Sequence, residues 1–206
     1  MSTTIRFKGQ NLSRTKVKNN ILRMWNDTTE DERHDWYKEA NLYAFNLAAM
    51  LLGGSFPDNH RKVCGIIAAL SPVKTWEQNK KIARDLLETG ECGHMKQFVH
   101  KAKKIISCDG SDESILSILN GRKISSFYLN IMYPASAEHV TIDRHALSIC
   151  LGYWITEDDY RGMTANQYEF FVQCFVLAAV KVGVKPLLMQ SATWVRWRKI
   201  KQDYKR

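Results

Sequence analysis

Residues 119–151 constrain the fold of this chain most, because turn and capping residues divide them into two short helices. A turn at Gly121 precedes an apolar segment over residues 123–132, and Pro134 interrupts the helical pattern after it. Asp143 then precedes a second apolar segment, and aspartate is a typical N-cap residue. This stretch therefore predicts a helix, a short loop and a second helix.

Both predicted helices begin with a charged side chain, Lys123 in the first and Asp143 in the second. A carboxylate is stabilised by the exposed N–H groups at a helix start. An ammonium group is disfavoured there, which favours the neutral amine, the nucleophilic form of lysine. Two interpretations follow. Lys123 and Asp143 are a catalytic amine–carboxylate pair, or Asp143 is only an N-cap and Lys123 a solvated or phosphate-facing side chain.

The order Gly-x-Lys, apolar helix, loop and Val-Thr-Ile-Asp-Arg-His resembles the helix-hairpin-helix DNA glycosylases, the superfamily of endonuclease III and oxoguanine glycosylase. In that family a Leu-Pro-Gly-Val-Gly-x-Lys hairpin binds DNA phosphate, and its lysine attacks the sugar carbon that bears the base. An aspartate in a following Val-Asp-x-His segment assists. The resemblance implies that Lys123 is the nucleophile and Asp143 the assisting acid, with Arg144 and His145 close to the DNA.

The predicted turn departs from the hairpin of that family. Leu119 stands at the position of the first hairpin glycine, and Ile118 and Asn120 replace the proline and valine. A glycine lets backbone amides approach a phosphate without a Cβ clash, so this departure leaves tight phosphate capture open. Asn120 tolerates a positive φ, and Asn-Gly can still form the turn. We expect Asn120, Gly121 and Arg122 to contact DNA.

A second segment of the chain, Ala-Leu-Ser followed by Pro72, Val73 and Lys74, resembles the same family. There an apolar helix ends in Leu-Ser-Gln-Gln-Thr or a similar sequence, and the next loop enters the minor groove and helps fill the gap left by a flipped base. The resemblance implies that Pro72, Val73 and Lys74 contact DNA, with a stiff Pro-Val wedge suited to unstacking bases. The altered sequence equally indicates an engagement of DNA that differs from that of repair enzymes.

The balance of charges favours a polyanionic partner. The chain of 206 residues has 30 Lys and Arg residues against 21 Asp and Glu residues, a formal charge of +9. Such a surface favours nucleic acid, and here we expect double-stranded DNA with an extruded nucleotide. Near the end of the chain Arg196 and Arg198 interleave with Trp194 and Trp197. That pattern suits phosphate and base contacts, or two tryptophans that anchor a helix while the cations remain in solvent.

The patterns together predict an all-α, two-lobed glycosylase-like fold that occupies residues 1–206 as a single domain. The helix-hairpin-helix element and the catalytic segment fall within residues 115–151. Residues 1–20 are basic and are expected to form a frayed arm, or an arm that contacts phosphate. Apolar periodicity and capping residues predict further helices over residues 26–52, 58–70, 75–87, 94–106, 115–119, 168–182 and 185–206. Thr75, Ser111 and Thr164 are the expected caps of the helices over residues 75–87, 115–119 and 168–182.

The five cysteines are scattered along the chain, and no two have the spacing of a metal site. We therefore expect no disulfide framework, no metal, no cofactor and no iron–sulfur cluster of the kind that some relatives hold on four C-terminal cysteines. No apolar run is long enough to span a membrane, and neither terminus resembles a signal peptide. We expect a cytoplasmic monomer.

The resemblance implies an enzyme that flips a damaged or modified base and cleaves its N-glycosidic bond. Two alternatives remain open. The chain also resembles the phage-linked alpha-glutamyl/putrescinyl thymine pyrophosphorylases, which are thought to act on hypermodified thymine in DNA. The second alternative is a DNA-binding module that has kept the scaffold and lost catalysis.

Overall fold

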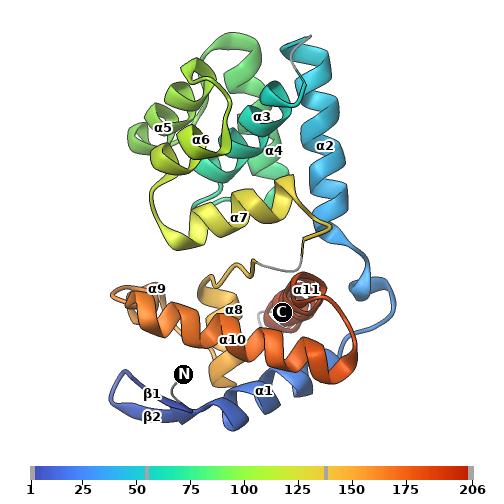
Figure 1. Cartoon of the computed structure of the whole chain (residues 1–206), viewed down its shortest axis with the longest axis vertical. Helices are drawn as coiled ribbons and strands as arrows, with labels where there is room; N and C mark the ends of the chain where they lie inside the picture. Colours follow the sequence, from blue (N-terminus) through green and yellow to red (C-terminus); the bar gives the residue numbers. More distant parts are fainter. Residues whose placement is uncertain (1–2, 54–55, 137–138, 204–206) are drawn as a thin grey trace. The chain divides into compact units, whose positions relative to one another are not determined.

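The computed structural model describes residues 3–53, 56–136 and 139–203, with side chains described as far as residue 200. Within these ranges the regular secondary structure is helical except for one two-stranded hairpin, which confirms the expected all-α class (Figure 1). The chain divides into two compact units. Unit 1 consists of Met1–Trp36 and Ala135–Arg206, and unit 2 of Tyr37–Pro134. Each unit has its own buried core.

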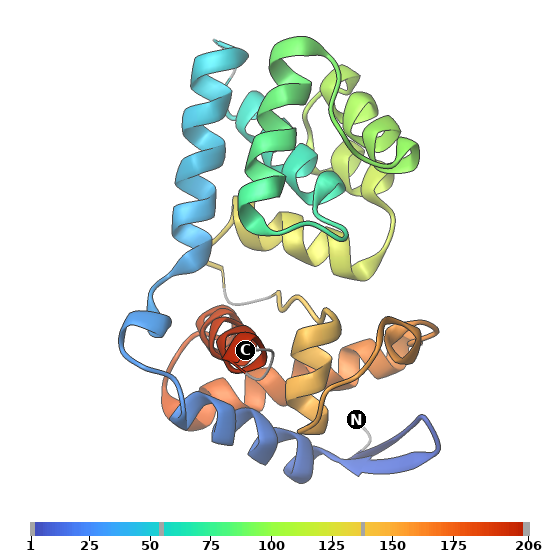
Figure 2. The same cartoon turned by 180° about the vertical axis from the view of Figure 1, so that it is seen from behind.

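Unit 2 is built around one buried helix. Its helices are α2 (Trp36–Leu51, whose first residue belongs to unit 1), α3 (Asp58–Leu70), α4 (Trp76–Thr89), α5 (Lys96–Ser107), α6 (Asp112–Leu119) and α7 (Arg122–Met132). Helix α3 packs against α4, α5, α6 and α7, and the view from behind in Figure 2 shows α4 in front of it. A Cβ on Gly65 would lie 2.8 Å from Ile115, so glycine permits this close packing.

Capping residues begin the helices of unit 2 where the sequence predicts them. The Thr75 hydroxyl accepts the backbone N–H of Gln78, and the Gln78 side chain accepts the N–H of Thr75 in return. The Ser111 hydroxyl accepts the N–H of Ser114 at the start of α6. Both arrangements satisfy N–H groups that a helix leaves without intrahelical partners. The predicted helices over residues 58–70, 75–87, 94–106 and 115–119 are therefore confirmed, with small shifts at their ends.

Unit 1 combines the two ends of the chain. Its elements are β1 (Thr4–Phe7), β2 (Gln10–Ser13), α1 (Arg14–Asn26), the 3-10 turn η1 (Asp31–Arg33), α8 (Arg144–Leu151), α9 (Glu157–Tyr160), α10 (Ala165–Val182) and α11 (Pro186–Asp203). Helix α10 packs against α1, α8 and α11, and the Thr164 cap predicted for it is present. Phe171 and Phe175 on α10 are fully buried and form the centre of this core.

The prediction of a frayed arm over residues 1–20 is wrong for residues 3–20, and residues 1 and 2 lie outside the described residues. The strands β1 and β2 form an antiparallel hairpin, and α1 begins directly after it. Phe7 and Leu12 are buried, and the Phe7 and Phe171 rings form a T-shaped pair with 5.6 Å between ring centroids. Val17 and Ile21 continue the buried face along α1. Most residues of this segment are polar or basic. Its few apolar residues therefore did not indicate that it forms part of the core.

The predicted helix over residues 26–52 is also wrong in its first part. Helix α1 ends at Asn26, η1 follows, and α2 begins only at Trp36. The acidic run therefore does not form the first turn of a long helix. Glu32 is 2% exposed, accepts the backbone N–H of Thr29 at 3.0 Å and lies 2.9 Å from the Lys199 ammonium. Long-range ion pairs, and not the local capping pattern, therefore determine the structure of this acidic run.

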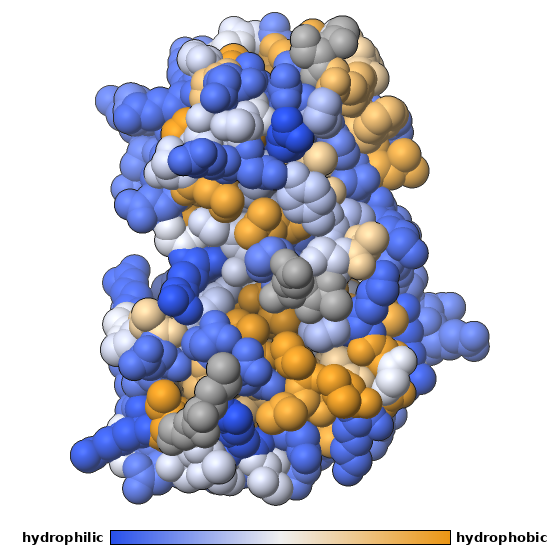
Figure 3. All heavy atoms as spheres, in the orientation of Figure 1, coloured by the Kyte–Doolittle hydropathy of each residue, from blue (hydrophilic) through white to orange (hydrophobic). Residues whose placement is uncertain are grey.

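Exposed apolar side chains gather on one helix in each unit. Figure 3 shows an apolar patch over the C-terminal half of α10, where the exposed residues are Leu177, Val180 and Val182. In unit 2, Leu42, Phe45, Met50 and Phe56 are exposed on and beside α2. The remaining surface of the face shown in Figure 3 is mostly hydrophilic.

Candidate functional site

Two residues, Asn120 and Gly121, connect α6 to α7 in unit 2. Both have a positive φ, 43° at Asn120 and 133° at Gly121, and these are residue types that tolerate such conformations. The predicted turn is therefore present. Leu119, at the position of the missing glycine, is fully buried, and its carbonyl accepts a hydrogen bond from the Lys101 ammonium at 2.6 Å. The turn is thus fixed by a buried leucine and a lysine contact.

Lys123 lies in the first turn of α7, as the sequence predicts. Gly121 occupies the N-cap position and has no side chain to cap the helix, in contrast to Thr75 and Ser111 at α4 and α6. Arg122 is exposed and Lys123 is half-buried. An uncapped helix start followed by two cations is an electrostatically favourable place for an anion such as a phosphate.

Asp143 is the N-cap of α8 in unit 1, and both of its carboxylate oxygens accept hydrogen bonds. Oδ1 accepts the backbone N–H of Ala146 at 2.7 Å, which confirms the predicted cap. Oδ2 accepts the indole Nε1–H of Trp194, on α11, at 2.9 Å. The second contact joins residues far apart in the chain, and no local pattern in the sequence predicts it.

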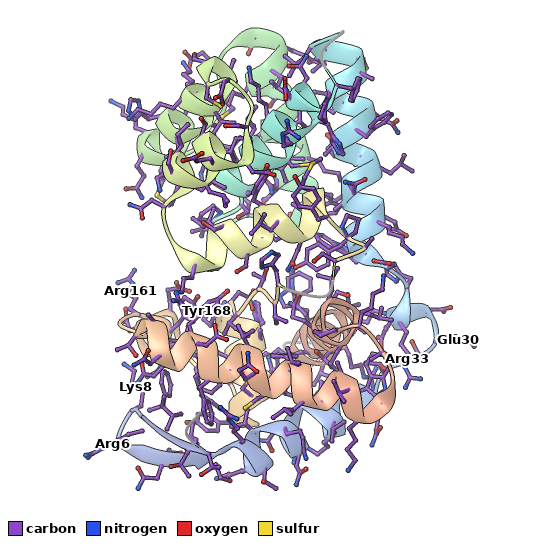
Figure 4. The ribbon with its side chains drawn as sticks, viewed as in Figure 1. Arg6, Lys8, Glu30, Arg33, Arg161 and Tyr168 are labelled. Carbon is purple, nitrogen blue, oxygen red and sulfur yellow. The ribbon has the colours of Figure 1, made fainter. Side chains whose placement is uncertain are left out.

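Two tyrosine hydroxyls hold the backbone that leads to Asp143. The Tyr168 hydroxyl accepts the Ile142 N–H at 3.0 Å and donates to the Val140 carbonyl at 3.2 Å. The Tyr160 hydroxyl donates to the Ile142 carbonyl at 2.7 Å. Burial raises the pKa of Tyr160, so its hydroxyl remains a donor. Figure 4 labels Tyr168 on α10. Neither tyrosine contact is predictable from the sequence, because the partners lie many residues away.

Trp194 joins Asp143 to two further residues that the sequence singles out. The Arg198 guanidinium lies over the Trp194 ring, 4.7 Å from its centroid. The His145 ring meets the Trp194 ring edge-on, with 6.1 Å between centroids. Unit 1 therefore brings Asp143, His145 and Arg198 together around one half-buried indole. A cation over an aromatic face is an attractive arrangement that also restricts both side chains.

The other two arginines predicted to contact DNA in unit 1 form internal ion pairs. The Arg144 guanidinium lies 3.3 Å from the Glu157 carboxylate and donates to the Ile155 carbonyl. The Arg196 guanidinium lies 2.9 Å from the Asp27 carboxylate. Acidic neighbours already neutralise both cations, which makes them weaker candidates for phosphate contacts than Arg198.

The loop between α3 and α4 in unit 2 presents an apolar side chain to solvent. Val73 has a φ of 63°, and its side chain is 83% exposed. A β-branched residue is strained in this left-handed region, so the surrounding structure must hold it there. The Lys74 N–H donates to the Ser71 carbonyl, and the Lys74 ammonium donates to the Gly93 carbonyl. Strain and full exposure at one loop tip are typical of a contact surface rather than of packing.

Comparison with known proteins identifies a family. Residues 3–201 match the family of unknown function DUF7178. The chain belongs to this family. No curated protein and no solved structure matches it. The match to DUF7178 runs through both units, so it includes the α6–α7 turn, the α3–α4 loop and the surroundings of Asp143.

In this DUF7178 protein the predicted site residues divide between the two units. Asn120, Gly121, Arg122 and Lys123 belong to unit 2, together with the loop over residues 72–74. Unit 1 contains the remaining five, which are Asp143, Arg144, His145, Arg196 and Arg198. The local geometry of each group is established, and the pairing of Lys123 with Asp143 stays a prediction.

Two further properties of the DUF7178 chain concern metals and membranes. Among the residues that the structure describes, no three His, Cys, Asp or Glu side chains are grouped so that they could hold a metal ion. The five cysteines are free, and Cys64, Cys150 and Cys174 are buried. Within the same residues, no helix by itself has the length and hydropathy needed to cross a membrane; α10 and α11 meet the criterion only as a pair bent by 100°.

Proposed function

We propose that this protein acts on DNA as an enzyme of the helix-hairpin-helix glycosylase type. It extrudes a damaged or modified base and cleaves its N-glycosidic bond, with Lys123 as the nucleophile and Asp143 as the assisting carboxylate. The observation that carries the proposal is the α6–α7 turn. Two helices are joined by two residues of positive φ, and Lys123 lies in the first turn of the second helix. A two-residue turn with a lysine shortly after it supports the resemblance from which the proposal comes, although Leu119 replaces the first hairpin glycine.

The distribution of charge supports a DNA substrate. Unit 1 has 17 Lys and Arg residues against 12 Asp and Glu residues, and unit 2 has 13 against 9. Each unit is therefore basic by itself, with net formal charges of +5 and +4. Phosphate neutralisation by lysine and arginine supplies most of the affinity of a protein for nonspecific DNA. A chain with a single basic unit would support the proposal less well.

The strained loop tip supports base extrusion in particular. An apolar side chain that enters the base stack offsets part of the cost of unstacking, which is about a few kcal/mol per step. Val73 is exposed, apolar and held in an unfavourable backbone conformation. Its exposed position and restricted backbone suit insertion next to the extruded nucleotide.

The chemistry requires two groups and no metal. The neutral Lys123 amine attacks the C1′ carbon, and the N-glycosidic bond breaks with its electron pair on the base, which takes up a proton. The Asp143 carboxylate stabilises the positive charge that develops on the sugar. The adduct then loses a proton from nitrogen, and the sugar ring opens to give a Schiff base between Lys123 and C1′. Borohydride reduces this Schiff base to a stable amine.

The proposal is tested with duplex oligonucleotides that carry oxidised, deaminated or phage-type modified bases. Wild-type protein is expected to release one class of base and to form a borohydride-stabilised covalent complex. The Lys123→Ala variant is expected to bind the same DNA and to lose the covalent complex. Lys104→Ala, which removes an exposed lysine of α5, is the matched control and is expected to retain it.

Other outcomes identify the alternatives. A change in the mass of a modified thymine without an abasic product would support the pyrophosphorylase-like activity. Salt-dependent binding without either product would indicate a DNA-binding module. Absence of salt-dependent binding to any of these duplexes would refute a role on DNA.

A further inference from the structure

Trp194 holds one oxygen of the Asp143 carboxylate, and this contact is not required for helix capping. We propose that Trp194 is a positioning residue, whose indole N–H fixes the orientation of the Asp143 carboxylate toward the substrate. The inference rests on the proposed function and adds to it a residue on α11.

The two carboxylate oxygens of Asp143 have different hydrogen-bond donors, so its role as a helix cap can be distinguished from its orientation by Trp194. The Ala146 N–H to Oδ1 contact of 2.7 Å already makes Asp143 an N-cap, and capping needs only one acceptor oxygen. Oδ2 is held separately by the Trp194 Nε1–H at 2.9 Å. Because the two donors come from different helices, they fix the plane of the carboxylate, whose terminal torsion is otherwise soft. A carboxylate that must stabilise charge on a sugar gains from such restriction.

The indole is itself held in place. Arg198 lies 4.7 Å from its centroid, and the His145 ring meets it edge-on. Ion pairs fix α11 against the segment after α1, with Arg196 at 2.9 Å from Asp27 and Lys199 at 2.9 Å from Glu32. Contacts to the indole and ion pairs of its helix therefore both restrict Trp194. A side chain restricted in this way transmits its orientation to the group that it hydrogen-bonds.

Helix α11 also provides a matched control. Trp197, one turn further on, is 6% exposed, and its ring centroid lies 3.9 Å from that of Trp154. Its Nε1–H has no hydrogen-bond partner among the side chains that the structure describes, which extend to residue 200. Trp197 anchors α11 by packing alone. Trp194→Phe and Trp197→Phe remove the same atoms from the same helix, and only the first removes a donor to Asp143.

The first test compares single-turnover base release and DNA affinity for the two variants, at a temperature where both are folded. Trp194→Phe is expected to release base at least about tenfold more slowly with an unchanged Kd, because a hydrogen bond to a charged group is lost. Trp197→Phe is expected to release base at nearly the wild-type rate. If wild-type protein is active and Trp194→Phe is no slower than Trp197→Phe, the inference is wrong and the proposed function stands.

The second test does not depend on activity. In a ¹⁵N-resolved NMR spectrum, each tryptophan gives one indole N–H signal, assigned by its loss in the corresponding variant. Asp143→Asn is expected to shift the Trp194 signal and to leave that of Trp197 in place. An unshifted Trp194 signal would overturn the contact and the inference with it. A shifted signal in a protein that releases no base from any duplex means that the proposed function has failed, and Trp194 then has only a structural contact.

Discussion

Replacing Glu32 by glutamine tests how strongly the C-terminal helix is held in unit 1. The Glu32 carboxylate is 2% exposed and lies 2.9 Å from the Lys199 ammonium and 3.9 Å from the Arg196 guanidinium. It also accepts the Thr29 N–H. Glutamine keeps the size and an acceptor oxygen for that N–H, so the substitution removes the charge alone.

The expected loss of stability follows from the exposure of the partners. Removing one member of a fully buried ion pair costs about 3–5 kcal/mol, because an uncompensated charge remains in the interior. Here the Lys199 side chain is 55% exposed and that of Arg196 is 29% exposed, so both cations remain partly hydrated without Glu32. Exposed pairs contribute about 0–1 kcal/mol each. We therefore expect Glu32→Gln to lower the free energy of unfolding of unit 1 by about 1–2 kcal/mol.

The loss depends on pH in a defined direction. Burial alone would raise the pKa of Glu32, but the Thr29 N–H and the cations Lys199 and Arg196 outweigh it and hold that pKa below its usual 4.5. A lowered pKa stabilises the folded state above the unfolded value, and the contribution disappears as pH falls through the folded value. The difference between wild type and Glu32→Gln is therefore constant from neutral pH to about pH 5 and narrows below that.

Urea unfolding followed by tryptophan fluorescence measures this difference. Five of the six tryptophans belong to unit 1, so the signal reports mainly on that unit. The control is Glu30→Gln, which removes the same charge from an exposed neighbour that Figure 4 shows pointing away from the chain. Glu30→Gln is expected to change stability by less than about 0.5 kcal/mol. Equal effects of the two variants at pH 7, or a difference that does not narrow as pH falls from 5 to 3, would refute the argument.

Three substitutions in unit 2 test its backbone conformations, with stability measured by hydrogen exchange of the α3 amides. Gly110→Ala places a Cβ 2.7 Å from that of Asp58 at a φ of 85°, and should cost about 2–3 kcal/mol. Gly90→Ala, at a φ of 77° with open space, should cost about 1 kcal/mol, and equal costs would contradict the clash. Val73→Asn, which relieves the left-handed strain at a φ of 63°, should stabilise unit 2 by about 0.5–1 kcal/mol and slow base release. A less stable Val73→Asn variant would show that the loop is not strained.

The sequence predicts those parts of the molecule that depend on near neighbours. Asp143, Thr75, Ser111 and Thr164 all cap the helices assigned to them, because the cap and its N–H partner lie three residues apart. The Asn-Gly turn before α7 is equally local. In each case the residue type and its immediate sequence determine the backbone conformation, so one short pattern is sufficient.

The predictions that are wrong or absent all concern contacts between distant parts of the chain. The hairpin over residues 4–13 contains only a few apolar residues, and Phe7 becomes informative only when Phe171 is placed beside it. The sequence places Glu32 in the first turn of a helix, whereas in the structure it pairs with Lys199 of α11. The Trp194 contact to Asp143 spans 51 residues. Tertiary contacts decide all three, and a single sequence does not specify which distant segments meet.

Ion pairs within unit 1 reduce the number of arginines that could bind phosphate below the number that the net charge suggests. The formal charge of +9 counts every lysine and arginine equally. In unit 1, however, Arg144 and Arg196 lie against the carboxylates of Glu157 and Asp27. A phosphate must compete with those carboxylates, so such arginines contribute less to binding than their number implies. Arg198 instead lies over the Trp194 indole, which donates a hydrogen bond to Asp143. A phosphate bound to Arg198 would therefore lie close to the residue that contacts this carboxylate. Of the three arginines predicted to contact DNA in unit 1, Arg198 is therefore the strongest candidate, and it also contacts the indole that donates to Asp143.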